Sequence, residues 1–193
     1  MIGRFLWGAA LIFVMTGPSA AQTTVPQGYR DAIHWYRAEA ERGYAAAQYL
    51  LGYMYETGVE IPQDNYRVAR DPALARHWYG KAAAQGDARA LYRLARMVHE
   101  GRGGPADVAE AARLYREAAE RGHVEAQSAL GYLYALGEGV ERDDLKAYIW
   151  LSLAARAGDG AAADNLTLLL PELSADTRAA GDALVEAWKP RKP

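Results

Sequence analysis

The chemistry open to this sequence rests first on its histidines, because imidazole can hold a metal or carry a proton near neutral pH. They are His34, His77, His99 and His123, and none has a partner in the H-x-x-x-H or H-E-x-x-H spacing of a helical zinc site. His34 and His77 occupy the same position of a repeat, so packed helices would hold them roughly 8–10 Å apart. That separation is too large for a shared metal, and we predict neither a metal site nor a cofactor.

Other catalytic signatures are also missing from the sequence. It has no cysteine, which excludes a thiol nucleophile and thiolate ligands. It contains no G-x-S-x-G, no S-x-x-K and no glycine-rich phosphate loop after a strand. The formal net charge of −2 argues against nucleic acid as a partner, since phosphate binding needs an excess of clustered Lys and Arg. We therefore predict a protein-binding protein and not an enzyme.

Basic side chains at equivalent repeat positions are the strongest candidates for binding. If the Trp, Tyr and Ala positions of each repeat point into the core, the positions opposite them form a basic stripe. Its members are His34, Arg37, His77, Lys81, Arg113 and Arg116. Such a stripe would receive an acidic peptide or the acidic surface of a partner protein. The alternative is an ordinary solvated helix face.

These residues are positioned by an internal repeat, which a sequence should be searched for first. An aromatic or leucine pair followed by small residues at fixed offsets occurs four times, at Trp35-Tyr36, Trp78-Tyr79, Leu114-Tyr115 and Trp150-Leu151. The spacing between copies is 36 residues, with a seven-residue insertion between the first two. The apolar and small residues recur at i, i+3, i+4 and i+7, which is one face of an α-helix.

Each copy therefore predicts two helices joined at a glycine, a helical hairpin that must stack on its neighbours to bury both faces. We place the hairpins at about 29–63, 72–106, 108–142 and 144–170. A capping helix occupies the segment 171–188, with Ser174 as its N-cap. No strand is predicted. Ile149 and Leu153 are apolar where other copies are polar, so they are either covered by the capping helix or exposed to a partner.

The loops that close the hairpins end in aspartate, at Asp64, Asp107 and Asp143. Aspartate there can accept the free N–H groups of the next helix. We favour this capping role over a calcium loop, whose alternating Asp and Asn ligands are absent. Asp71-Pro72 offers a second start in the first loop. The insertion at 65–71 therefore either lengthens the following helix back to Asp64 or loops out at the surface.

Together these columns resemble the Sel-one-like repeat family, a tetratricopeptide-like class with the pattern A-x-x-W-Y-x-x-A-A-x-x-G, A-x-x-x-L-G-x-x-Y and G-x-G-V-x-x-D. The third copy, Ala111 to Asp143, matches best, with Leu114 in place of Trp. The second loop departs by lacking the Val. The resemblance covers about residues 29–170. It implies a right-handed α-solenoid used as an adaptor between proteins, and for exported bacterial members a regulator in the cell envelope.

The resemblance also implies an alternative, because some cysteine-rich relatives are linked to binding or hydrolysing β-lactams or cell-wall fragments. Those relatives staple each hairpin with a disulfide, which this sequence cannot form. We therefore favour the scaffold over this enzymatic reading.

The N-terminus predicts export. Arg4, an apolar run of about eleven residues from Phe5 to Met15 and the small residues before Gln22 are typical of a signal peptide at 1–21. The alternative, a membrane anchor, needs roughly 20 apolar residues. We expect a periplasmic or secreted protein without an integral membrane segment after cleavage. A flexible leader at 22–28 and a disordered basic tail at 189–193 complete the predicted organisation.

Overall fold

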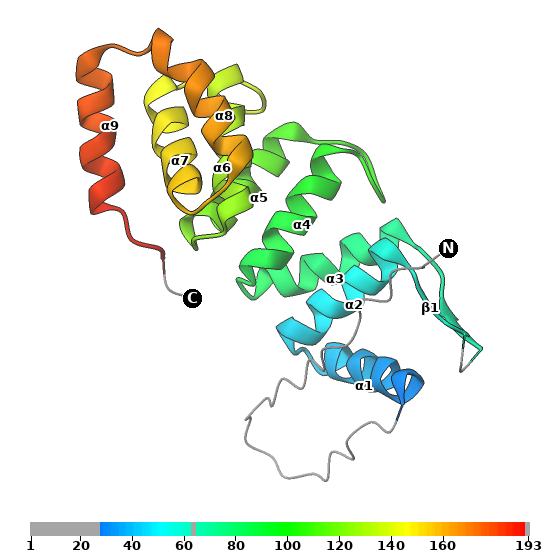
Figure 1. Cartoon of the computed structure of the whole chain (residues 1–193). Coiled ribbons are helices and arrows are strands. Elements are labelled where there is room, and N and C mark those ends of the chain that lie inside the picture. The colour runs from blue at the N-terminus through cyan, green and yellow to red at the C-terminus, as the bar shows by residue number, and fades with distance from the viewer. Residues whose placement is uncertain (1–27, 63–64, 192–193) are drawn as a thin grey trace, which may run out of the picture.

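The computed structural model of the protein describes residues 28–62 and 65–191, which form a curved array of helices (Figure 1). The helices are α1 (Tyr29–Glu41), α2 (Ala45–Thr57), α3 (Pro72–Ala84), α4 (Ala88–His99), α5 (Val108–Glu120), α6 (Val124–Leu136), α7 (Asp144–Arg156), α8 (Gly160–Leu169) and α9 (Ala175–Ala187), with a 3-10 turn η2 (Leu170–Glu172) before α9. The predicted signal peptide at 1–21, and the leader apart from Gly28, lie outside the described residues.

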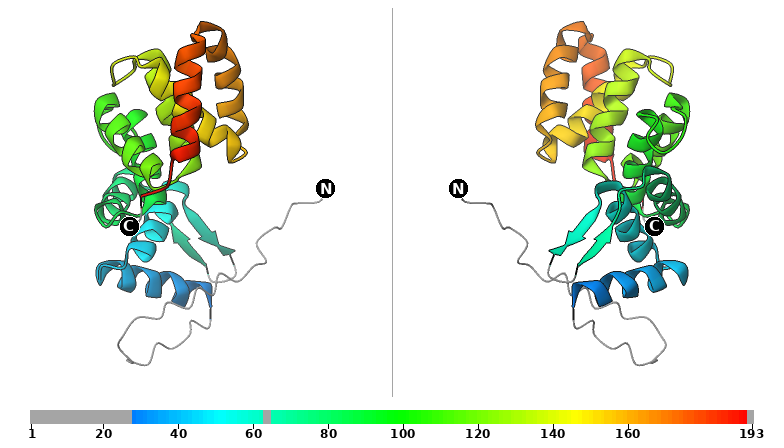
Figure 2. Two further views of the ribbon diagram at one scale, coloured as in Figure 1. Left: turned by 90° about the vertical axis from the view of Figure 1, so that its left-hand side faces the viewer. Right: turned by 90° about the vertical axis from the view of Figure 1, so that its right-hand side faces the viewer.

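Helices α1 to α8 form the four predicted hairpins, each made of a first helix (α1, α3, α5, α7) and a second helix (α2, α4, α6, α8). Helices α2, α4 and α6 each pack against the first helix of the next hairpin as well as against their own partner. Figures 1 and 2 show the hairpins following one another from α1 to α9. This stacking confirms the prediction of an all-α solenoid.

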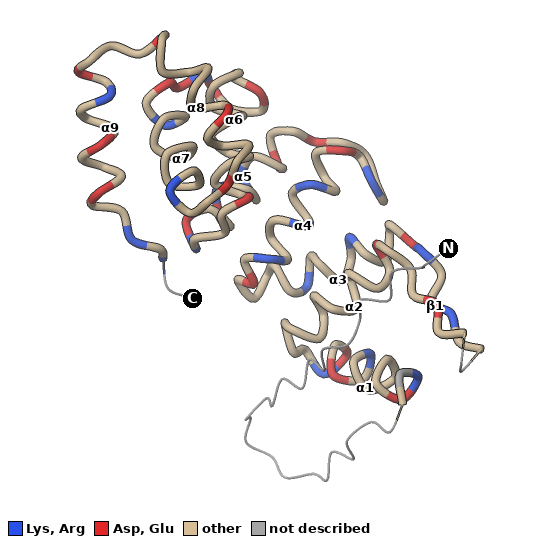
Figure 3. The backbone as a smooth tube through the Cα atoms, viewed as in Figure 1, with Lys and Arg blue, Asp and Glu red and all other residues tan. Residues whose placement is uncertain are grey.

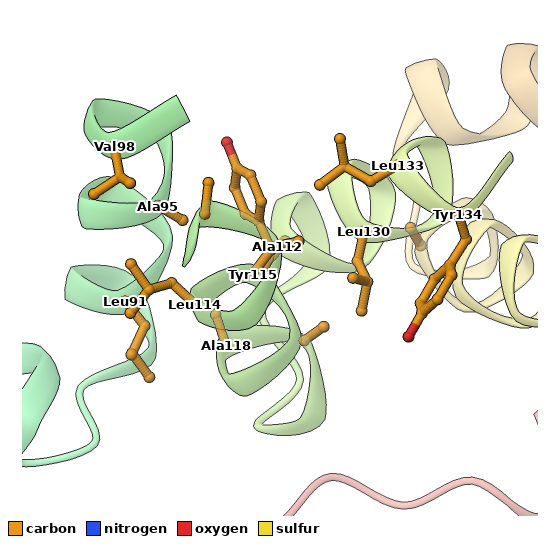
Figure 4. Close-up of a cluster of buried hydrophobic side chains, with 14 of the residues drawn as sticks. Leu91, Ala95, Val98, Ala112, Leu114, Tyr115, Ala118, Leu130, Leu133 and Tyr134 are labelled. Carbon is orange, nitrogen blue, oxygen red and sulfur yellow. The ribbon is translucent and has the colours of Figure 1, made fainter. Parts of the chain in front are cut away.

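The core lies between successive hairpins and is built from small residues that let helices approach closely. Ala75, Ala111 and Ala147, one repeat position, are fully buried. Figure 4 shows Leu91 and Val98 of α4 beside Tyr115 of α5, and all three are buried. The tryptophans of the repeat are less deeply placed, since Trp35, Trp78 and Trp150 are half-buried.

Aspartate caps start the first helices as predicted. In α3 the Asp71 carboxylate accepts the N–H of Leu74 at 3.0 Å. In α5 and α7, Asp107 accepts the N–H of Glu110 and Asp143 that of Lys146, both at 2.9 Å. Asp64 lies outside the described residues. Two second helices, α4 and α8, are capped in the same way by Asp87 and Asp159, which the sequence analysis did not identify.

The insertion corrects the expectation of a chain without strands. Strands β1 (Val59–Ile61) and β2 (Tyr66–Val68) pair antiparallel, with Val59 opposite Val68. Because α3 begins at Pro72, the insertion does not extend that helix. Ile61 and Val68 are buried in a small cluster with Ile33 of α1, so apolar burial holds the hairpin against α1 and α2, where Figure 2 shows it.

Helix α9 packs on α7, the first helix of the last hairpin. Ser174 caps it as predicted, accepting the N–H of Thr177 at 3.0 Å. Gly181 is required where the helices cross, because a Cβ there would overlap the ring of Tyr148. The tail is not disordered along its whole length, which corrects our expectation: the N–H of Arg191 donates to the carbonyl of Glu120 at 2.6 Å.

Candidate partner-binding surface

Two members of the basic stripe, Arg37 of α1 and Arg116 of α5, occupy equivalent positions and make equivalent contacts. Arg116 Nη2 donates a hydrogen bond to Tyr134 Oη at 2.9 Å, and its guanidinium lies 5.9 Å from the ring centre. Arg37 Nη2 donates to Tyr55 Oη at 3.4 Å. In both hairpins the arginine links the first helix to the second, and it remains partly accessible.

Three further members, His34, His77 and Lys81, are exposed and lie against aromatic rings. The His34 ring is 5.6 Å from the ring of Tyr66 in β2. Lys81 Nζ lies 4.6 Å from the centre of the Trp78 ring. The ring centres of His77 and Trp78 are 5.3 Å apart. The indole face attracts the ammonium group and so holds Lys81 along the surface of α3.

Arg113 is balanced by acids of its own helix. It donates two hydrogen bonds to Glu110, at 2.7 and 2.8 Å, and a third to Glu117 at 3.4 Å. The bonds to Glu110 raise the pKa of the Arg113 guanidinium above its ordinary value. The stripe is therefore less positive over α5 than its sequence indicated, and both signs of charge alternate along the array in Figure 3.

Helices α1, α3 and α5 each carry two members of the stripe, three or four residues apart, and among the described residues no hydrogen bond joins any two members. On the fourth first helix, α7, the equivalent positions are Ile149, Ser152 and Leu153. Ser152 and Leu153 are buried, with 6% and 9% of their surface exposed, and Ile149 is half-buried. The equivalent Lys81 of α3 is exposed. Of our two alternatives for Ile149 and Leu153, cover by α9 is the one the structure supports.

The contacts between α9 and α7 show how this face holds a helix. Tyr148 Oη donates to Asp182 Oδ1 at 2.7 Å, and Arg156 Nη1 donates to Glu186 Oε1 at 2.6 Å. Burial, and then the bond to Asp182, raise the pKa of Tyr148. Asp182 and Glu186 are one helical turn apart, so α9 presents an acidic edge to α7.

A hollow of about 410 Å³ lies where the third hairpin meets the fourth. It is lined by the end of α6, the loop that follows and the adjoining helices, through Arg116, Tyr134, Val140, Glu141, Arg142, Asp143 and Lys146. We call it the junction hollow. One stripe residue, Arg116, forms part of its wall, whereas the others do not.

The sequence analysis missed a buried polar cluster between the first and second hairpins. Glu56, at the end of α2, is 8% exposed. Its carboxylate accepts hydrogen bonds from Tyr79 Oη at 2.7 Å and Arg102 Nη1 at 2.8 Å, and Arg93 Nη1 lies 3.6 Å away. Burial alone would raise the pKa of Glu56, but these bonds and positive charges outweigh it and lower the pKa.

An equivalent cluster, in which the loop supplies the carboxylate, lies between the second and third hairpins. His99 takes the position of Glu56, Tyr115 that of Tyr79, and Glu138 that of Arg102. His99 Nε2 is 3.6 Å from Glu138 Oε1, and the rings of His99 and Tyr115 are 6.3 Å apart. The repeat alignment contained this signal, because these positions change together from copy to copy.

The described part of the chain contains neither a cluster of metal-binding side chains nor a helix that could span a membrane. No group of three or more His, Asp or Glu side chains there is arranged to hold a metal ion. No described helix combines the length and apolar character needed to cross a bilayer.

Stacked hairpins with a variable face define an α-solenoid scaffold. Sequence comparison then identifies the particular class: four Sel1 repeats match residues 21–44, 45–87, 88–123 and 124–159, and the chain belongs to this family. The last three matched units run from the second helix of one hairpin through the first helix of the next, so their boundaries differ in phase from ours. Sel1 repeats typically form non-catalytic scaffolds for protein–protein interaction. No curated protein matches the chain.

Solved structures share the fold. A protective antigen of uropathogenic Escherichia coli strains with an SLR fold is 30% identical over 83% of this chain, with a TM-score of 0.71. A Sel1 repeat protein from Oxalobacter formigenes is 36% identical over 74%, with a TM-score of 0.65. The alignments span only 33% and 40% of those two chains. Cysteine-rich protein B of Helicobacter pylori, 20% identical over 75% of this chain and 98% of its own, shares the fold alone, with a TM-score of 0.51.

Proposed function

We propose that this protein is an exported scaffold, an adaptor or regulator in the bacterial cell envelope, that binds an acidic protein or peptide on its first helices. The binding face is the one that carries the basic stripe over α3 and α5. One observation carries the proposal: the chain's own acidic helix, α9, already packs on α7 through Tyr148 and Arg156, which flank in sequence the stripe-equivalent positions Ile149, Ser152 and Leu153.

The two ends of this face are covered and its middle is open. Over α1 the β-hairpin packs on Ile33, and over α7 helix α9 packs on Tyr148. Between them His77, Lys81 and Arg113 are exposed. A partner segment with acidic side chains one turn apart, as in α9, would place its carboxylates among these cations.

Export is the second part of the proposal and rests on the predicted signal peptide at 1–21. The relative from uropathogenic Escherichia coli is a protective antigen. An antigen of this family supports export of the present chain, because an exported protein is accessible to antibodies.

Affinity capture from envelope extract tests the proposal. The bait is the protein, compared with a variant in which Arg113→Glu and Arg116→Glu reverse two charges of the stripe. A matched control reverses Arg89 and Arg96, two partly exposed arginines of the second helix α4. We expect the stripe variant to lose its captured partner at least tenfold and the control to retain it. Equal capture by all three proteins would reject the binding face.

A further inference from the structure

The junction hollow contains a buried tyrosine that faces two cations. The side chain of Tyr134 is 6% exposed. Lys146 Nζ of α7 lies 5.3 Å from its ring centre and the Arg116 guanidinium of α5 lies 5.9 Å from it. Three helices of two hairpins therefore bring an arginine and a lysine to one ring at the wall of the hollow.

The wall of the hollow carries the cations Arg116, Arg142 and Lys146 and the carboxylates Glu141 and Asp143, and these charges are only partly paired with one another. Lys146 Nζ pairs with Asp143 Oδ2 at 2.7 Å, while Asp143 also caps α7. The hydrogen-bond partner of Arg116 is a neutral phenol, and within residues 28–62 and 65–191 no carboxylate forms an ion pair with it. Arg142 is held by Asp144 at 2.8 Å and Glu172 at 2.7 Å.

The same place at the other junctions lacks the second cation. Between the first and second hairpins the equivalents of Arg116, Tyr134 and Lys146 are Arg37, Tyr55 and Leu74. Between the second and third hairpins they are Gly80, Val98 and Glu110. The fold therefore does not require a pair of cations here, and it tolerates an apolar or acidic residue in place of Lys146.

We propose that the junction hollow binds the side-chain carboxylate of a glutamate or aspartate of the partner, held by Arg116 and Lys146. Arg116 supplies the planar fork that matches a carboxylate, and Lys146 supplies a second donor. Val140, half-buried in the wall, offers an apolar surface for the methylene groups of the bound side chain. This inference rests on the proposed function and names the anchor within the binding face.

The experiment titrates the ¹⁵N-labelled protein with an end-blocked tetraglutamate peptide, and with tetraglutamine as the uncharged probe. Arg116→Gln and Lys146→Gln are the test variants. The Lys146 side chain is 54% exposed, so its replacement leaves the core intact. Arg96→Gln is the matched control, because the Arg96 guanidinium also lies 5.9 Å from a tyrosine ring centre, that of Tyr92, but on a second helix outside the stripe.

We expect tetraglutamate to shift the resonances of the hollow, tetraglutamine to leave them unchanged, and each test variant to weaken binding at least fivefold. Arg96→Gln should change it less than twofold. Equal losses in Arg96→Gln, or full binding by Lys146→Gln, would overturn the inference.

Capture from envelope extract separates the two proposals. A partner that is captured equally by the protein and by Lys146→Gln would reject the anchor while the scaffold function stands. Tetraglutamate binding that requires Arg116 and Lys146, without any captured partner, would support the anchor and count against the adaptor function.

Discussion

The first and second junctions of this solenoid place polar groups at the same positions, with the carboxylate on opposite sides of the contact. At the first junction the end of α2 supplies an acid, Glu56, and the loop after α4 supplies the cation, Arg102. At the second junction the end of α4 supplies His99 and the loop after α6 supplies the acid, Glu138. A repeat fold thus fixes where a polar contact lies and leaves its polarity free.

The two clusters differ in burial, and this decides how much each contributes to the stability of the fold. The Glu56 side chain is 8% exposed, whereas the side chains of His99 and Glu138 are 30% and 44% exposed. A carboxylate removed from water must be compensated by its partners, while a half-exposed pair is solvated and screened. The first junction should therefore depend on its polar contacts far more than the second.

The largest expected effect comes from Glu56→Ala. It leaves Tyr79 Oη without an acceptor and two arginines without their carboxylate, and we expect a loss of about 3 kcal/mol in the free energy of unfolding. The lower end of the usual range applies because the arginine side chains keep 29% and 24% exposure and can be hydrated. Urea unfolding measures the change.

Glu138→Ala is the matched control at the second junction. Because it removes only a half-exposed pair with His99, we expect a loss of roughly 0–1 kcal/mol. Equal losses for the two variants would show that burial does not separate the junctions.

A smaller effect is expected where α2 meets the ring of Tyr79. A Cβ at Gly52 would lie 2.7 Å from Tyr79 Cδ1. The second junction already carries a methyl group there, at Ala95, so its tyrosine leaves more room. We expect Gly52→Ala to cost about 1–3 kcal/mol, because the ring must move away from Glu56.

Gly80→Ala is the control for this substitution, because nothing lies within 4 Å of a Cβ at that helical position. It should stabilise the protein by about 0.5–1 kcal/mol. A stabilised Gly52→Ala variant would contradict the close contact at the first junction.

The repeat frame was predictable because its signals are local and recur. The small residues at 40, 83 and 119, the glycines after each first helix and the aspartate caps depend on backbone geometry that every copy shares. The same alignment placed Arg37 and Arg116 correctly at equivalent positions. It did not show that their side chains bond to Tyr55 and Tyr134, because that contact depends on how two helices cross.

The features that sequence reasoning missed arise where copies differ. Seven added residues turn the first loop into a β-hairpin. Its strands are three residues long, too short for an alternating pattern to be recognised. Glu56 gave no signal in the sequence, since its partners Arg93 and Arg102 are 37 and 46 residues away. The junction hollow likewise combines residues of two hairpins, so only the packed structure brings Arg116 and Lys146 together.

The smallest expected effect is a loss of folding stability in acid. It should occur over different pH ranges at the two junctions. His123 precedes α6 without a side-chain capping hydrogen bond, and it stacks on Tyr92 of the second hairpin, with ring centres 4.6 Å apart. Burial lowers its pKa more than the nearby Glu125 raises it. The unfolded chain therefore binds a proton more readily, and stability is lost as pH falls below the ordinary histidine pKa of about 6.5.

Glu56 acts in a lower window. Its folded pKa is depressed, so the stability it contributes is complete above the ordinary glutamate pKa of about 4.3 and is lost as pH falls through the folded value. Unfolding free energies of the protein, His123→Gln and Glu56→Gln, measured from pH 7.5 to 3, should resolve both windows. His123→Gln should flatten the profile near pH 6 and Glu56→Gln should flatten it below pH 4.5. Identical profiles for all three proteins would contradict this assignment of acid sensitivity to the two junctions.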